Sequence, residues 1–269
     1  MGFLKWKEGN PVTLEELIHK RFADIPYPEL IYSLDFQAGE EKHSAGILSV
    51  SFFCQNTAEV MPEALETLIR DRLRDVILKP EGGNPCCFVW LRTDGVTAEE
   101  EKSSLTIRRE IRFEILEYPW QESADPDPVA AAGRYLKSLY PECLVMGCDS
   151  MGEITEVTET QPVIYCRPDT LEKAEETNTV VWMDSKIAVH IISPSHESRM
   201  KLAVSMANRM SLDGELILPD QSPMFLKGLS VHDRADDLKE GQLVFTGHYG
   251  LLRYRPEQRR LLQGKFHYE

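Results

Sequence analysis

The hydrophobic positions of this chain follow two periods. Over residues 105–116 and 47–53, apolar and polar side chains alternate, which predicts strands with one buried face. Over residues 62–77 the apolar positions recur every three or four residues, which predicts an amphipathic helix that must lie on an apolar surface. Another helix is predicted over 13–22, because Thr13 begins a capping-box pattern and prolines follow its end. The first half of the chain is therefore expected to place helices on one face of a mostly antiparallel sheet.

The same order of elements is predicted again in the second half of the chain. Both halves read helix, strand, polar segment, strand, helix, strand and long strand. The first series covers residues 13–22, 28–32, 47–53, 62–77, 87–91 and 105–116, and the second covers 128–140, 162–165, 186–192, 195–211, 224–229 and 242–255. Few residues are identical between the two series, so the repeat rests on the order and spacing of the elements. Self-similarity at such a long period is typical of tandem domains.

The boundary between the two series is predicted within residues 117–128, which are rich in proline and acidic residues and cannot sustain a regular element. Asp127 and Pro128 then match the start of a helix, with the aspartate as its cap and the proline in its first turn. We therefore predict an α+β protein of two tandem domains, residues 1–120 and 121–269. Each domain is expected to hold a mixed or antiparallel sheet with helices packed on one face.

Long polar segments occupy equivalent places in the two series, at residues 35–45 and 167–178. Each falls between two predicted strands and is rich in glutamate and lysine. A polar excursion that recurs in the same place suggests a hairpin arm of the kind that subunits extend to their neighbours. A solvated loop explains the same composition, so both interpretations stay open at this point. A third segment, residues 79–85, reads as a loop around two adjacent glycines.

Composition and charge narrow the classes of function. The 269 residues carry a net charge of −14, whereas binding to a nucleic-acid backbone draws on clustered Lys and Arg, so no direct nucleic-acid contact is expected. No apolar run approaches the roughly 20 residues of a membrane span, so no membrane contact is expected either. Residues 1–10 lack the apolar core of a signal peptide, which predicts that the chain stays in the cytoplasm where it is made.

The six cysteines do not match a metal site. A zinc site normally uses two couples of closely spaced ligands, and no Cys-x-x-Cys pair occurs here. The cysteines are therefore expected to be buried, reduced thiols, and neither a metal nor another cofactor is expected. They are Cys54, Cys86, Cys87, Cys143, Cys148 and Cys166.

The sequence assigns no catalytic residue. It lacks a nucleophile elbow, a glycine-rich phosphate loop and a dinucleotide fingerprint. Ser195 precedes a predicted helix and is better explained as its cap than as a nucleophile. His232 and His248 on two late strands, and Asp149 in a glycine-punctuated loop, are the acid–base candidates of an alternative function, a cytoplasmic enzyme with a site between the domains. A binding or adaptor module in another complex is a third alternative.

The order of elements resembles the tail terminator, or tail completion, proteins of long-tailed bacteriophages. Members of that family are small α/β proteins that form a ring closing the head-proximal end of the tail tube, and they usually carry one such domain. The resemblance is carried first by residues 28–32, 47–53, 62–77 and the strand through Arg108, Phe113 and Leu116, and then by residues 162–165, 187–192, 195–211 and 243–255.

This resemblance implies a structural component of a phage or prophage tail, acting by self-association and by capping the tube. Other tail proteins would be its partners. The protein would occupy the host cytoplasm during assembly and the virion tail afterwards.

Arginines on the polar faces of the two long strands form the candidate assembly surface. They are Arg108, Arg112, Arg253 and Arg255. Basic strips on an acidic protein suit head-to-tail contact, and such contacts close into rings when the rotation permits. Rings of three or six chains are expected, because three chains with two domains each form a pseudo-symmetric ring of six domains. Alternatively, the arginines pair locally with Glu110, Glu114 or Glu257 and contribute little, as exposed ion pairs usually do.

Overall fold

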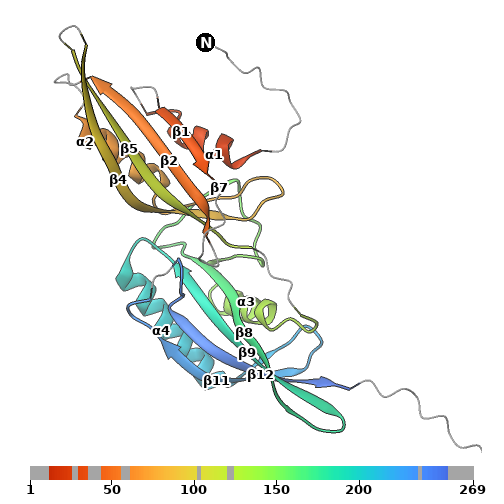
Figure 1. Cartoon of the computed structure of the whole chain (residues 1–269). Helices are drawn as coiled ribbons and strands as arrows, with labels where there is room; N and C mark the ends of the chain where they lie inside the picture. The colour runs from red at the N-terminus through yellow and green to blue at the C-terminus, as the bar shows by residue number, and fades with distance from the viewer. Residues whose placement is uncertain are drawn as a thin grey trace, which may run out of the picture.

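The protein forms two units, which lie end to end (Figure 1). The computed structural model describes residues 12–25, 30–35, 44–55, 61–101, 104–119, 124–235 and 238–253 of the chain. Each unit is built on a six-stranded sheet. In these ranges, no helix has the length and apolar character needed to cross a membrane.

The first unit takes most of its elements from the first half of the chain. These are α1 (Leu14–Phe22), β1 (Leu30–Asp35), β2 (Ser44–Gln55), α2 (Pro62–Leu73), β3 (Val76–Leu78), β4 (Cys86–Glu101) and β5 (Ser104–Glu117). The strand order in its sheet is β1-β2-β5-β4-β3-β7. The last of these strands, β7 (Ile154–Glu156), comes from beyond residue 121 and pairs antiparallel with β3. Strand β7 therefore crosses the predicted domain boundary at residue 120, because it follows that boundary in the sequence but belongs to the sheet of the first unit.

The second unit contains the remaining elements. These are α3 (Pro128–Leu139), β6 (Leu144–Val145), β8 (Val163–Glu176), β9 (Val180–Ile192), α4 (His196–Asp213), β10 (Glu215–Ile217), β11 (Pro223–Val231) and β12 (Leu243–Leu252). The strand order in its sheet is β10-β11-β12-β9-β8-β6. Only β6 runs parallel to its neighbour, and the other pairs are antiparallel.

Five strands of each sheet repeat one topology. The order β1-β2-β5-β4-β3 in the first unit corresponds to β8-β9-β12-β11-β10 in the second, with one helix before the series and one after its second strand. The sixth strand differs, because β7 joins the β3 edge and β6 joins the β8 edge. The predicted α+β class with two tandem sheets is therefore confirmed, and the repeat extends to the pairing of the strands.

Side-chain caps set the starts of three helices. The Thr13 hydroxyl accepts from the backbone N–H of Glu16, whose carboxylate accepts from the N–H of Thr13, so the capping box before α1 is present. Asp127 accepts from two backbone N–H groups at the start of α3. Ser195 accepts from the N–H of Ser198 and caps α4, as predicted.

The predicted helix over 62–77 is too long. Helix α2 ends at Leu73, and Val76 and Ile77 belong to strand β3. Asp75 between them has a φ of 50°, in the left-handed region that a helix cannot contain. The apolar pattern continues past Leu73 because strand β3, which lies between β4 and β7 in the sheet, is buried on both of its faces. Helix α2 and strand β3 therefore both need apolar residues.

Each unit buries its helices against one face of its sheet. In the first unit, Leu17 and Ile69 of the helices pack with Val50 and Phe113 of the strands. In the second, helices α3 and α4 pack on the residues of β8, β9 and β11 that face them. We call the opposite side of each sheet its outer face.

A third cluster, which we call the joint, connects the two units through their outer faces. The first unit contributes Ile77, Cys87, Leu116 and Tyr118, and the second half of the chain contributes Met146, Val157, Val163, Tyr165 and Ile192. The rings of Tyr118 and Tyr165 meet edge to face with centroids 5.0 Å apart, a favourable aromatic geometry. The Tyr165 hydroxyl donates to the carbonyl of Pro119. An ion pair of 2.7 Å between Lys239 and Glu114 also links the units.

Candidate assembly surface

The β8–β9 hairpin forms an arm that leaves the body of the second unit (Figure 1). From Asp169 to Glu176 every residue of β8 is exposed, and β9 returns from Val180. The segment 167–178 is therefore a hairpin arm and not an irregular loop. Its counterpart in the first unit, 35–45, lies mostly outside the described residues.

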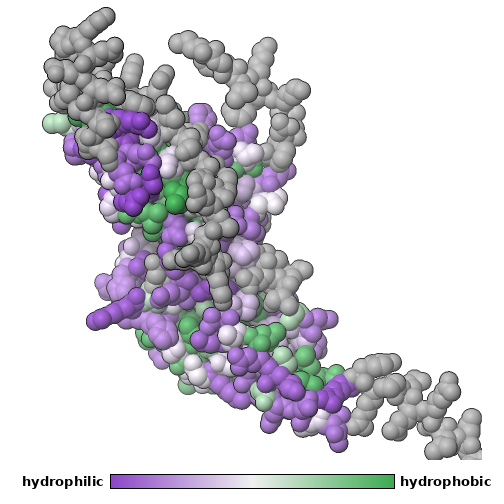
Figure 2. Space-filling view, in the orientation of Figure 1, coloured by the Kyte–Doolittle hydropathy of each residue, from purple (hydrophilic) through white to green (hydrophobic). Residues whose placement is uncertain are grey.

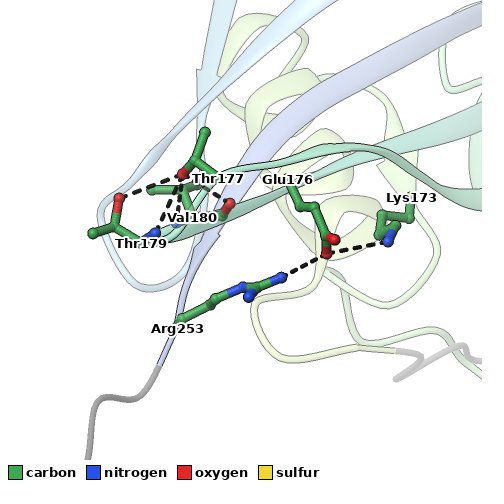
Figure 3. Close-up of polar contacts among 6 residues, drawn as sticks. All are labelled: Lys173, Glu176, Thr177, Thr179, Val180 and Arg253. Carbon is green, nitrogen blue, oxygen red and sulfur yellow. Dashed lines mark hydrogen bonds and ion pairs between the residues drawn. The ribbon is translucent and has the colours of Figure 1, made fainter.

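The tip of the arm is a tight turn held by threonine (Figure 3). The Thr177 hydroxyl oxygen accepts from the backbone N–H groups of Thr179 and Val180, at 3.3 and 3.0 Å. The backbone N–H of Thr177 donates to the carbonyl of Val180 at 2.8 Å. These bonds satisfy the polar backbone of the turn locally, so the arm keeps a defined shape in solvent.

Arg253 is tied to the arm. Its guanidinium pairs with Glu176, which also pairs with Lys173 at 3.1 Å (Figure 3). Its backbone N–H donates to the carbonyl of Thr179 at 2.8 Å. The hydrogen bond and charge of Lys173, followed by the charge of Arg253, hold the pKa of Glu176 below its usual value. Arg253 therefore fastens the end of β12 to the arm, and its charge is shared with a local carboxylate.

Arg112, a candidate on β5 of the first unit, is also paired locally. Its Nε donates to Glu110 and forms an ion pair with Asp94, at 3.0 Å in each case. Glu114, another carboxylate named for local pairing, instead binds Lys239. Arg108 is exposed on β5, and Arg255 lies outside the described residues. The local pairs reduce the positive potential that these arginines were expected to offer, and the structure does not bring Arg112 and Arg253 together, since they lie on different units.

The free edge of β8 is poorly suited to pairing with another strand. Strand β6 covers only Val163 and Ile164. Beyond them, Pro168 lacks a backbone N–H, and the register against β9 shifts between Pro168 and Thr170 and again between Lys173 and Glu175. Proline, bulges and charges are the devices that keep exposed edges from pairing. The arm is therefore expected to make contacts through its faces and tip, not through its backbone edge.

A stripe of three apolar residues and one histidine crosses the outer face of the second sheet and reaches the arm at Trp182, which lies opposite Glu175. It consists of Ile217, Phe225, His248 and Trp182, on β10, β11, β12 and β9, and we call it the aromatic stripe. Phe225 lies opposite His248 in the sheet, and the His248 ring stacks on Trp182 with centroids 4.8 Å apart and planes 2° from parallel. Hydrophobic residues also show on this unit in Figure 2.

The polar side of the aromatic stripe is a histidine–carboxylate pair. Nδ1 of His248 lies 2.6 Å from Oδ1 of Asp184 and donates to it, since a carboxylate only accepts. This bond fixes the ring over Trp182. Sequence reasoning missed the stripe, although the signal was present: Trp182 and Phe225 are large apolar residues at positions where the alternation of their strands predicts polar ones.

The three acid–base candidates do not form a site. Nε2 of His232 is hydrogen-bonded to the Ser230 hydroxyl at 3.0 Å. The backbone N–H of His232 donates to the carbonyl of Gln242, which precedes His248 by six positions in the chain. At roughly 3.3 Å per residue, the two histidines are about 20 Å apart. Asp149 accepts from the backbone of Val145 and pairs with Lys137, so it stabilises its own loop.

Other chemistry in the described ranges is sparse. A hollow of about 750 Å³ lies on the outer face of the second sheet and is lined by both signs of charge, including Arg167, Lys186, Asp169 and Glu240. Burial raises the pKa of Cys166 to about 12, so this thiol stays protonated. No three His, Cys, Asp or Glu side chains within the described part of the chain are grouped so that they could hold a metal ion.

Comparisons with the profiles of known protein families, with curated proteins and with solved structures give no match to this chain.

Proposed function

We propose that this protein is a structural assembly component that acts by associating with copies of itself. The β8–β9 arm is the observation that carries the proposal. It holds eight consecutive exposed residues of β8, from Asp169 to Glu176, in a fixed hairpin outside the body of the unit. Strand β12 pairs with β9 from Val180 to Val189 and so holds the arm in place, while the side chains of β8 stay exposed, where a second chain can contact them.

The resemblance in element order extends the proposal to the tail of a phage or prophage. In that role, the chains form a ring of three or six copies that caps the tail tube, with other tail proteins as partners. The site of action is the host cytoplasm during assembly and then the virion tail. The repeated topology supports the ring, because three chains with two similar units each supply six similar units for a pseudo-symmetric ring.

The charges on the arm suggest how it meets a neighbour. Glu172 and Glu175 are exposed near the tip, and among the described residues neither makes an ion pair within 4.0 Å. Arm and receiving surface are therefore expected to attract each other electrostatically, which affects the rate of association more than its strength. Arginines that pair with carboxylates of their own chain, such as Arg112, contribute less positive potential to this attraction than the sequence suggested.

Light scattering at increasing protein concentration, repeated in raised salt, tests self-association. We expect masses three or six times the 30.7 kDa of one chain. The charge reversal Glu172→Lys/Glu175→Lys is expected to slow assembly, whereas Glu142→Lys/Glu159→Lys, the same change at exposed positions away from the arm, should not. Electron microscopy of the protein mixed with tail tubes tests the capping role. A chain that stays monomeric in every condition and forms no ring on the tubes would refute the proposal.

A further inference from the structure

We propose that the β8–β9 arm of one chain binds a groove between the two units of a second copy of this chain. The groove is lined by three arginines and an exposed tryptophan, and we call it the arginine groove. This inference rests on the self-association proposed above and names the surface that receives the arm.

The arginine groove takes its walls from both units and has a volume of about 560 Å³. The first unit contributes Arg70 and Arg74 at the end of helix α2, and Trp90 of strand β4. The second unit contributes Arg199, near the start of α4. Hollows of about 300–1,000 Å³ are the size that takes a ligand, so the groove has room for side chains of another chain.

An arginine–tryptophan pair lies at the centre of the groove. The guanidinium carbon of Arg70 is 3.9 Å from the centroid of the Trp90 ring, which is a cation–π contact. The indole Nε1 of Trp90 donates to the Thr93 hydroxyl at 3.4 Å, and the residue is nevertheless 42% exposed. Tryptophan and arginine are the residue types most enriched where interfaces gain their binding energy. A half-exposed pair of the two, held in a groove, therefore favours contact with another chain.

The groove carries positive charge that its own chain does not neutralise. Among the described residues, no carboxylate lies within 4.0 Å of the Arg70 guanidinium. Arg74 pairs with Asp75 at 3.4 Å, but its side chain is 70% exposed. Asp71 is the other carboxylate of the lining, so three arginines stand against two aspartates on a chain whose net charge is −14. The groove is therefore a local excess of positive charge, and an acidic partner fits it.

The outer face of the arm has the complementary character. In the sheet, Glu172 lies opposite Asp184 and Glu175 lies opposite Trp182, so these side chains share the face that holds His248. Asp184 is already bonded to His248, whereas Glu172 and Glu175 are exposed. The arm thus presents two exposed carboxylates beside an aromatic ring. Carboxylates and guanidinium groups form strong, charge-assisted hydrogen bonds, so this face suits the arginine groove.

The arm cannot reach the groove of its own chain. Strand β8 begins in the joint at Val163, and at roughly 3.3 Å per residue Glu172 and Glu175 lie about 30 and 40 Å along it. The groove lies beside the joint, since Val89 and Leu238 line the groove and also pack against the joint. In Figure 1, the arm leaves the second unit on the side remote from the first unit. The contact is therefore made between chains, arm to groove, and is of the heterologous type that closes rings.

Two other surfaces of the second unit suit the arm less well. The hollow on the outer face of its sheet is lined by three acidic side chains as well as three basic ones, besides His232, and its Lys186 already pairs with Asp169 at 2.8 Å. The aromatic stripe holds one basic side chain, His248, which is bonded to Asp184. Neither surface combines an exposed aromatic ring with arginines.

Reversal of the charges on each side, first separately and then together, tests the contact. Glu172→Lys/Glu175→Lys reverses the arm, and Arg70→Glu/Arg74→Glu reverses the groove. Each pair of changes alone is expected to weaken assembly about 10-fold or more at low salt, because attraction becomes repulsion. The chain that carries all four changes should assemble as the unaltered chain does, since opposite charges face each other again.

The matched control for the groove is Arg134→Glu/Lys227→Glu. It makes the same change in net charge as the groove reversal, at two exposed positions outside the groove. Its assembly should stay within about 2-fold of that of the unaltered chain, because surface charges outside a contact contribute little to it.

Analytical ultracentrifugation of each chain separates the outcomes, with circular dichroism to verify folding. If the unaltered chain assembles and Arg70→Glu/Arg74→Glu assembles equally well, the groove does not receive the arm, although self-association stands. If both single-sided reversals weaken assembly and the chain with all four changes does not recover, the two surfaces do not face each other and the inference is wrong. If the unaltered chain never assembles, the proposed function and this inference both fail. Should the groove reversal not fold, Arg70→Gln/Arg74→Gln takes its place and is expected to weaken assembly relative to Arg134→Gln/Lys227→Gln.

Discussion

Substitution of Leu116 by alanine tests whether the joint makes the two units unfold together. The Leu116 side chain is 0% exposed and lies in the cluster formed by both units. The change removes about three buried carbon groups, at about 0.8 kcal/mol each, and leaves a cavity whose cost is added to this transfer term. We therefore expect a loss of about 3 kcal/mol in the free energy of unfolding, within the range of about 2–5 kcal/mol measured for buried leucines.

The assay uses one tryptophan in each unit as a local probe. Trp90 lies on β4 of the first unit and Trp182 on β9 of the second, and Trp6 and Trp120 are replaced by phenylalanine in all proteins compared. In urea, both probes should report one midpoint for the unaltered joint. Leu116→Ala should lower and separate the two midpoints, because it weakens the contact that couples the units.

Leu212→Ala is the control, since its side chain is 81% exposed and lies outside the joint. It should change the free energy of unfolding by less than about 0.5 kcal/mol. The reasoning is refuted if Leu116→Ala costs no more than this control. Coincident midpoints in Leu116→Ala, with a large loss of stability, would show that the coupling runs through other contacts, such as the pairing of β7 with β3.

Three further predictions concern single groups. Thr13→Ala removes the capping box of α1 and should cost about 1 kcal/mol in urea unfolding, whereas Thr13→Ser should cost much less. The pKa of Glu176 is lowered in the folded chain, so its ion pair with Lys173 stabilises the arm above the ordinary carboxyl pKa and is lost as the pH falls through the lowered value; an NMR titration should show the pKa return toward 4.5 in Lys173→Ala. Thiol titration at pH 8 should modify the exposed Cys148 well before the buried Cys166, whose pKa is about 12, and equal rates would contradict this order.

The joint gives the two units different roles despite their common topology. The first unit uses its outer face to bind the second, so Leu116 and Tyr118 are buried there. The second unit keeps the equivalent face open and adds the long arm beside it.

Local patterns in the sequence were sufficient for most of the fold. The alternation over 105–116 corresponds to β5, and the capping signals at Thr13, Asp127 and Ser195 mark the starts of three helices. The repeated order of elements also follows from local patterns, because each element's period is set by which of its own side chains are buried. The class and the doubled architecture could therefore be predicted from the chain alone.

Pairing between distant segments was decided by the tertiary structure. The apolar residues Val76 and Ile77 fit the end of a helix as well as a strand, and only β4 and β7 on either side make them β3. The sequence placed His232 and His248 on two late strands, and only the pairing of those strands shows that the two side chains lie far apart. The aromatic stripe likewise depends on four strands meeting, because a single strand shows only an apolar residue at a polar position. Periodicity reports the burial of one element, whereas a surface is made by contacts between elements that lie far apart in the sequence.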